Sequence, residues 1–150
     1  MKQNMRLFSP DIILVFIIFQ ILAHYFFPLI GIINSPYNYL GIFLIVIGQI
    51  PNFWIYFHFK KLRTTLKIYK MPNKLVTSGL FRISRNPNYL GMFITLLGMA
   101  ILLGTLMPFI FPVIFFILTD RFVIPLEEKN LKKAFGKKYL DYKRKVRRWI

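Results

Sequence analysis

Residues Tyr89 to Thr119, YLGMFITLLGMAILLGTLMPFIFPVIFFILT, form an apolar run without a charged side chain. As one helix this run would be about 46 Å long at 1.5 Å per residue, which exceeds a hydrocarbon core of about 30 Å. Gly104 and Pro108 lie near its middle, and glycine ends helices whereas proline begins them. The run therefore predicts a tight hairpin of two apolar helices, over residues 89–103 and 109–124.

Two further apolar segments come earlier, over residues 12–30 and 39–59. Lys2 and Arg6 precede the first segment as in a secretory signal peptide, but the segment is long for one and lacks a small-residue cleavage site. We interpret it as a retained transmembrane helix. The mean hydropathy of +0.52 together with a net charge of +16 is typical of a membrane protein whose charges lie outside the bilayer.

The distribution of basic residues supports four spans. Of the 21 Lys and Arg residues, two precede the first segment, eight lie within residues 60–88 and eleven follow from Arg121 onward. The connections near residues 30–38 and near Gly104 have none. The positive-inside rule then places both termini and segment 60–88 in the cytoplasm. We predict one all-α domain, a polytopic protein of a plasma membrane or prokaryotic inner membrane with four transmembrane helices.

The chain becomes strongly polar after Pro125. Apolar residues recur there at helical spacing among lysines: Leu131, Phe135, Tyr139 and Tyr142. This pattern predicts a basic amphipathic helix over residues 127–149 on the inner membrane surface, with an interruption at Gly136 and Trp149 at headgroup depth.

Small residues form stripes on two of the predicted helices. Gly41 and Gly48 lie seven residues apart on the second helix, and Gly91, Thr95 and Gly98 share one face of the third. Such stripes let transmembrane helices approach closely. Close packing is the simpler interpretation, and room for a ligand beside the third helix is the alternative.

Composition excludes several classes of site. The chain has no cysteine, and its two histidines and five carboxylates predict no metal centre. The basic residues flank apolar runs without a nucleic-acid-binding motif, so anionic membrane lipids are the predicted partners rather than nucleic acid. No P-loop, GxGxxG or Ser-His-Asp pattern is present.

A polar stretch, LVTSGLFRISRNPNYLG, occupies residues 75–91 at the start of the hairpin. It predicts a turn at Gly79 and a helix that begins with Asn86 as N-cap and Pro87 at the first position. The free N–H groups of such a helix end favour a carboxylate, and Arg85 could add a bidentate clamp. The alternative is a helix cap beside interfacial arginines that contact lipid phosphate.

A second polar patch follows the hairpin: Asp120, Arg121, Glu127 and Glu128. Asp120 and Glu127 share a helical face, as do Arg121 and Glu128, if Pro125 only kinks the helix. Carboxylates at the mouth of a span can bind an ammonium group or ribose hydroxyls, and ionisable residues deeper in a span are functional candidates. The alternative is an exposed Glu128 paired with a lysine one turn later.

Both polar stretches resemble a known family. Residues 75–91 resemble the LVtsGxYxxxRHPxYxG block, and residues 127–149 the EExxLxxxFGxxYxxYxxxVxR block, of membrane S-adenosylmethionine-dependent methyltransferases. These are the isoprenylcysteine carboxyl methyltransferases and their phospholipid methyltransferase relatives. The resemblance covers residues 75–149, half of the chain. It implies methyl transfer to a lipidic or hydrophobic small acceptor, with S-adenosylmethionine bound at the cytosolic end of the last two helices.

The resemblance also implies the site residues. It assigns cofactor contacts to Asn73, Lys74, Leu75, Val76, Phe81, Asn86, Pro87, Asn88, Tyr89 and Glu127. We add Glu128 as a cofactor contact and predict catalytic roles for Arg85 and Arg121. Phe81 stands where the family usually has Tyr. Asn86 replaces the His of the eukaryotic carboxyl methyltransferases, and the Arg that faces their substrate falls on Val123, with Arg121 the nearest basic residue. Both departures argue against a prenylcysteine acceptor.

Two other functions remain open from the sequence. One is a non-catalytic membrane scaffold or lipid-binding protein of the same fold, which the missing substrate arginine favours. The other is a reductase, because sterol reductases share a related C-terminal scaffold, although a chain of 150 residues lacks their additional spans.

Overall fold

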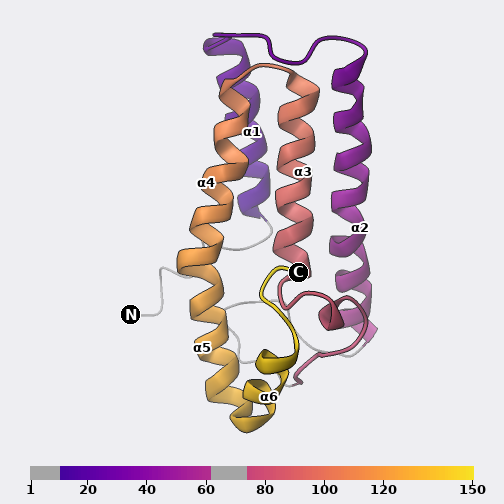
Figure 1. The fold of residues 1–150 in the computed structure, drawn as a ribbon, viewed down its shortest axis with the longest axis vertical. Coiled ribbons are helices and arrows are strands. Elements are labelled where there is room, and N and C mark those ends of the chain that lie inside the picture. The colour runs from indigo at the N-terminus through magenta and orange to yellow at the C-terminus, as the bar shows by residue number, and fades with distance from the viewer. Residues whose placement is uncertain (1–10, 62–73) are drawn as a thin grey trace.

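The computed structural model describes residues 11–61 and 74–150 as a helical protein whose main helices lie side by side (Figure 1). The α-helices are α1 (Asp11–Phe26), α2 (Leu40–Lys61), α3 (Pro87–Leu103), α4 (Ile110–Leu118), α5 (Ile124–Phe135) and α6 (Lys137–Lys145). Helix α5 continues α4 beyond the end of the bundle, and α6 turns back beside it (Figure 1). The predicted all-α fold is confirmed for the described residues.

The predicted hairpin between α3 and α4 is also confirmed. Gly104 ends α3 in the left-handed conformation with φ +73°, and Pro108 lies in the short 3₁₀ turn that precedes α4. The Gly104 carbonyl accepts hydrogen bonds from the N–H groups of Ile32 and Ile33, at 2.7 and 3.0 Å. The hairpin turn is therefore tied to the connection between α1 and α2.

The helix that begins after the hairpin turn does not end at Ile124. A π-helical turn, Thr119–Val123, joins α4 to α5, so that one helix runs from Met107 to Phe135. Because proline lacks an N–H group and its ring clashes with the carbonyl four residues earlier, a wider turn just before Pro125 lets the helix continue. The predicted boundary between a helix over 109–124 and a separate C-terminal helix is wrong, whereas the alternative of a continuing helix is confirmed.

The C-terminal segment differs from the single amphipathic helix predicted over 127–149. The predicted interruption is confirmed at Gly136, whose φ of +53° separates α5 from α6. Helix α6 ends at Lys145, and Val146 is already extended with φ −121° and ψ 132°. Trp149 turns inward instead of capping a surface helix, and its ring stacks on Phe116 with a centroid distance of 4.8 Å.

Helices α2 and α3 pack backbone against backbone. A Cβ atom added to Gly48 would lie 2.6 Å from the Gly91 carbonyl oxygen, and one added to Gly98 would lie 2.7 Å from that of Gly41. The interpretation of the glycine stripes as packing is therefore confirmed. Gln49 adds a hydrogen bond across this seam from Nε2 to the Thr95 hydroxyl, at 3.0 Å.

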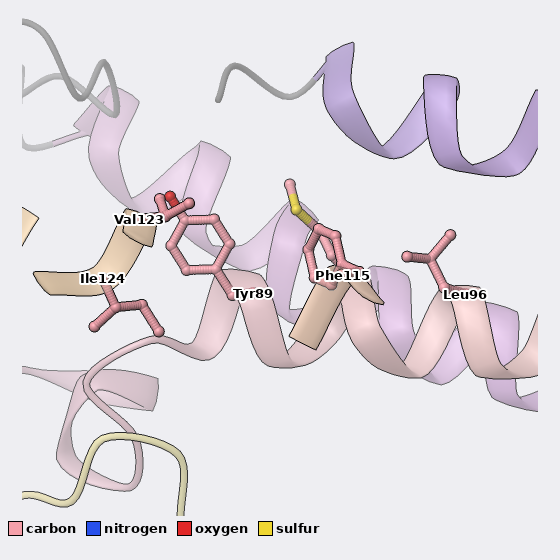
Figure 2. Close-up of a cluster of buried hydrophobic side chains, with 6 residues drawn as sticks. Tyr89, Leu96, Phe115, Val123 and Ile124 are labelled. Carbon is pink, nitrogen blue, oxygen red and sulfur yellow. The ribbon is translucent and has the colours of Figure 1, made fainter. Parts of the chain in front are cut away.

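The other side of α3 contributes to the apolar core. Figure 2 shows Tyr89 and Leu96 of α3 together with Phe115, Val123 and Ile124 of the helix that contains α4 and α5. Helix α1 closes this core through Phe16, whose ring meets that of Phe115 edge-on. Tyr89 lies in the first turn of α3, so it belongs both to the core and to the polar end of the bundle.

Two helices of the described ranges, Tyr37–Lys61 and Met107–Phe135, are long and apolar enough to cross a membrane. Two shorter helices, Ile12–Phe26 and Pro87–Leu103, are apolar as well. Exposed apolar side chains such as Ile18 and Phe43 cover the outward surfaces of α1 and α2.

Candidate cofactor site

The loop before α3 is fixed against the end of α2. The predicted turn at Gly79 is confirmed by its φ of +61°, and a side chain there would clash with the Trp54 indole. His58 Nε2 lies 3.3 Å from the Ser78 hydroxyl, and Trp54 stacks on His58. Aromatic packing from α2 therefore fixes the start of the short 3₁₀ helix Gly79–Arg82, which contains Phe81.

Helix α6 holds the same loop from the other side. The Tyr142 hydroxyl donates a hydrogen bond of 2.7 Å to the Phe81 carbonyl oxygen. Burial raises the pKa of Tyr142 to about 12, so this donor keeps its proton at physiological pH. The ring of Phe81 lies 5.8 Å from that of Phe59 in α2, and the loop is thereby held between α2 and α6.

Replacement of Gly79 by alanine is expected to loosen this loop. The substitution adds both a Cβ atom that collides with Trp54 and a backbone strain of about 1–2 kcal/mol, because only glycine adopts positive φ readily. Thermal melting in detergent should show a lower midpoint than for Gly31→Ala, where an added Cβ atom meets only the Asn34 side chain, at 3.8 Å. Equal melting shifts for the two variants would mean that the Trp54 contact does not hold the loop.

Arg85, at the end of the loop, pairs with Glu128 of α5. Their Nη1 and Oε1 atoms are 2.6 Å apart, and each side chain is only about one tenth exposed. Lys143 Nζ lies 2.6 Å from the other oxygen of Glu128, and Arg148 Nε lies 3.6 Å from the first. Glu128 is therefore neutralised by three cations, and the interpretation of it as an exposed surface residue is wrong.

Glu127 has a different environment although it is the next residue in the chain. It is partly buried, and its Oε1 atom accepts a hydrogen bond of 2.7 Å from the Tyr89 hydroxyl. Within residues 11–61 and 74–150 no basic side chain pairs with it. Glu127 directly follows Leu126, beyond the predicted span over residues 109–124, and its burial raises the pKa to about 7. A cationic ligand beside it would restore the charged form.

Asn86 precedes α3 at the predicted N-cap position, with Pro87 at the first helical residue. The side chain of Asn86 makes no capping bond; its Nδ2 atom donates to the Arg148 carbonyl oxygen at 2.9 Å. The prediction of a side-chain cap is therefore wrong. Asn88 and Tyr89 lie in the first turn, where N–H groups have no acceptor within their own helix.

Asp120 and Arg121 have contrasting positions on the π-helical turn. Asp120 Oδ1 accepts hydrogen bonds from Arg148 Nη1 at 3.1 Å and from the Trp149 indole at 2.9 Å. The Arg121 side chain is 78% exposed, and its guanidinium lies 3.8 Å from Asp120. No hydrogen bond or ion pair of the described residues joins Arg121 to Glu127, so Asp120 is the only carboxylate of the patch that it pairs with there.

The remaining predicted contacts lie along the loop and the first turn of α3. Lys74 is exposed, whereas Leu75, Val76 and Asn88 are half-buried. Asn73 lies outside the described residues.

Sequence reasoning missed Arg148 and Trp149 as parts of this region. The structure places their side chains on Asp120 and the Arg148 carbonyl on Asn86. A signal was available, because the final Arg of the family block EExxLxxxFGxxYxxYxxxVxR falls on Arg148. The contacts themselves could not be inferred, since they join residues 28 to 62 positions apart.

Comparison with known proteins agrees with this arrangement. The family model described as phospholipid methyltransferase matches residues 37–138. A "Probable protein-S-isoprenylcysteine O-methyltransferase" of Oryza sativa subsp. indica is 30% identical over 114 residues, which cover 73% of this chain and 58% of that protein. The "Protein-S-isoprenylcysteine O-methyltransferase" of Saccharomyces cerevisiae is 36% identical over 115 residues, which cover 71% of this chain and 46% of that protein.

The chain thus spans about half the length of the curated relatives it matches. No solved structure matches it at a significant level. The described residues form an apolar helical bundle with a partly buried carboxylate, Glu127, at its polar end. The chain belongs to the phospholipid methyltransferase family, whose members are integral membrane methyltransferases that use S-adenosylmethionine.

Proposed function

We propose that the protein transfers a methyl group from S-adenosylmethionine to a lipidic acceptor. The observation that supports this function is the environment of Glu127, a partly buried carboxylate with Tyr89 but no described basic residue as its partner. Because S-adenosylmethionine has an ammonium, a sulfonium and a carboxylate group, a site for it needs both an anionic residue and hydrogen-bond donors for the carboxylate. Glu127 supplies the first, and the free N–H groups at the start of α3 supply the second.

Three further residues, Tyr89, Phe81 and Arg85, would contribute to this site. Tyr89 directs its hydroxyl at Glu127 and would place its ring beside the sulfonium, since aromatic faces attract cations. Phe81, held between α2 and α6, would cover the adenine. Arg85 would act by fixing Glu128, because its guanidinium already pairs with that carboxylate, instead of clamping the cofactor directly.

The bound cofactor would supply an electrophilic methyl group on a sulfonium. The acceptor's nucleophilic atom forms a bond to the methyl carbon while the carbon–sulfur bond breaks, and the departing sulfur becomes a neutral thioether. The protein contributes mainly proximity and in-line orientation, worth up to about 7–11 kcal/mol. A carboxylate or thiolate acceptor needs no base, whereas an amine must lose a proton.

We further propose four membrane spans, with both termini and segment 60–88 in the cytoplasm. Helix α3 has 17 residues and is about 26 Å long, close to the thickness of a hydrocarbon core. The basic residues support this topology, because all 21 then lie on one side. The candidate site lies on that side, where water-soluble cofactor and membrane-embedded acceptor can meet.

The acceptor would be a lipid or a hydrophobic small molecule that reaches the site from the bilayer. Relatives of the chain are named as protein-S-isoprenylcysteine methyltransferases. At the positions where the prenylcysteine enzymes have His and Arg, this chain has Asn86 and Val123. Asn86 donates a hydrogen bond to the Arg148 carbonyl oxygen, and this contact does not depend on the kind of acceptor.

Two measurements test this function. Purified protein in detergent should bind S-adenosylmethionine, and membranes that contain it should transfer a radiolabelled methyl group into one of two fractions. Label in the base-labile volatile fraction identifies a carboxyl acceptor, and label in extracted lipid identifies an amine, hydroxyl or thiol. Absence of S-adenosylmethionine binding at millimolar concentration would overturn the proposal. It would favour a non-catalytic lipid-binding protein, whereas binding of a nicotinamide cofactor would indicate a reductase.

A further inference from the structure

The residues after α6 do not trail away from the bundle. Arg147, Arg148 and Trp149, called the strap below, lie between the loop that precedes α3 and the continuous helix that contains α4 and α5. Figure 1 shows the chain returning from α6 to end beside the start of α3. The strap joins the two polar segments that supply the proposed cofactor site.

The main chain of the strap holds the loop. The Arg147 carbonyl accepts a hydrogen bond from the Arg85 N–H at 3.0 Å. The Arg148 carbonyl accepts bonds from Asn86 Nδ2 at 2.9 Å and from the Ser84 hydroxyl at 3.3 Å. Each of three consecutive loop residues, Ser84 to Asn86, therefore donates one hydrogen bond to the strap.

The side chains of the strap hold the long helix. The Arg148 guanidinium bridges two carboxylates, with Nη1 3.1 Å from Asp120 and Nε 3.6 Å from Glu128. Trp149 donates its indole N–H to Asp120 at 2.9 Å and stacks on Phe116. Arg148 is about one third exposed, and both carboxylates are more buried than that, so water screens these pairs less than it screens surface ion pairs.

We propose that Arg148 is a positioning residue for the cofactor site. Its carbonyl fixes Asn86 at the start of α3, and its guanidinium fixes the helix that contains Glu127. Arg148 thereby sets the separation between the carboxylate-binding and ammonium-binding parts of the site without touching the ligand. This inference rests on the proposed function and extends it to a residue outside the predicted site.

Arg148→Ala tests the inference, with Arg147→Ala as its matched control. Arg147 is exposed, and its described hydrogen bond to the loop comes from its carbonyl, which alanine retains. Arg148→Ala should weaken S-adenosylmethionine binding about tenfold, since it leaves two partly buried carboxylates without this cation. The control should stay within about twofold, because a lost surface charge changes little. The KM of the lipid acceptor should change little in either variant.

Two further variants separate positioning from folding. Arg148→Lys keeps one charge but cannot bridge both carboxylates, so it should recover part of the affinity. Trp149→Phe keeps an aromatic ring beside Phe116 but removes the indole donor and part of the ring area, so it should weaken cofactor binding and lower the melting temperature slightly. Equal cofactor affinity in Arg148→Ala and Arg147→Ala, or a loss equal for cofactor and acceptor, would overturn the inference.

Hydrogen–deuterium exchange tests the strap without the cofactor. The Arg85 amide donates to the Arg147 carbonyl. Because Arg148→Ala removes the side chain that holds the strap on the long helix, it should speed exchange in peptides that contain Arg85. Arg147→Ala keeps that side chain and should not. If wild-type protein binds no S-adenosylmethionine, the proposed function fails while this measurement still decides whether the strap holds the loop. Unchanged exchange in both variants would overturn the strap itself.

Discussion

Glu127→Gln should weaken S-adenosylmethionine binding about a hundredfold, or about 2.7 kcal/mol, while the protein melts at nearly its usual temperature. Glutamine has almost the shape of glutamate, and its carbonyl oxygen can still accept the Tyr89 hydroxyl hydrogen bond. The substitution removes only the negative charge, which no described basic residue needs. Binding by calorimetry and melting in the same detergent give the two quantities.

Glu128→Gln is the comparison one residue away, and its expected signature is a marked loss of stability, with a smaller loss of cofactor affinity through Arg148. It removes the anion shared by Arg85, Lys143 and Arg148, and it leaves Arg85 about nine-tenths buried without its ion pair. Breaking a buried pair from one side destabilises by about 3–5 kcal/mol, so the melting temperature should fall markedly. If Glu128→Gln abolished binding at an unchanged melting temperature while Glu127→Gln bound normally, the roles assigned to the two carboxylates would be reversed.

The pH dependence of binding follows from the same assignment. A cation binds the ionised form of Glu127, and burial places the pKa of this carboxyl at about 7 in the unliganded protein. Above that pKa the carboxylate is already charged, so affinity should be level; below it a proton must leave first, and affinity should fall about tenfold per pH unit. Glu127→Gln should remove this dependence between pH 5.5 and 7. A level wild-type profile over that range would show that Glu127 does not bind the cation.

The features predicted from sequence are those that local rules govern. Gly104 and Pro108 mark the hairpin through backbone conformation alone, and positive φ at Gly79 and Gly136 produces the predicted turn and helix break. The predicted helix end at Ile124 is wrong, because a π-helical turn accommodates Pro125 and no local residue pattern predicts such a turn.

The pairing of charges could not be predicted in the same way. Glu127 and Glu128 are adjacent, so local sequence does not distinguish their environments. Only the fold brings three cations to Glu128 and the Tyr89 hydroxyl to Glu127. Asn86 was predicted to cap its own helix, which is the local solution, yet its amide instead meets a carbonyl 62 residues away. Local rules thus place the polar segments at the right ends of helices without specifying how they pair.

Gly48→Leu should strongly destabilise the described bundle. A Cβ atom at this position would lie 2.5 Å from the Thr95 hydroxyl and 2.6 Å from the Gly91 carbonyl. The second contact is with main chain, so no rotamer change relieves it and the helices must separate. Overpacking alone costs about 1–3 kcal/mol, and the loss of van der Waals packing along the seam adds to it. The variant should melt far below wild type or fail to accumulate in membranes.

Gly31→Leu is the control for added size, because the nearest atom to a Cβ there is 3.8 Å away. A second variant, Gly48→Leu with Thr95→Ala, separates the two contacts: removal of the hydroxyl leaves the Gly91 carbonyl in place, so stability should not return. The milder Gly48→Ala should fold in part and bind cofactor more weakly, because α2 also supplies Trp54 and His58 to the loop. Wild-type stability in Gly48→Leu would mean that α2 and α3 are not in backbone contact at Gly48. The contacts of Trp54 and His58 in α2 with the loop would then be in doubt as well.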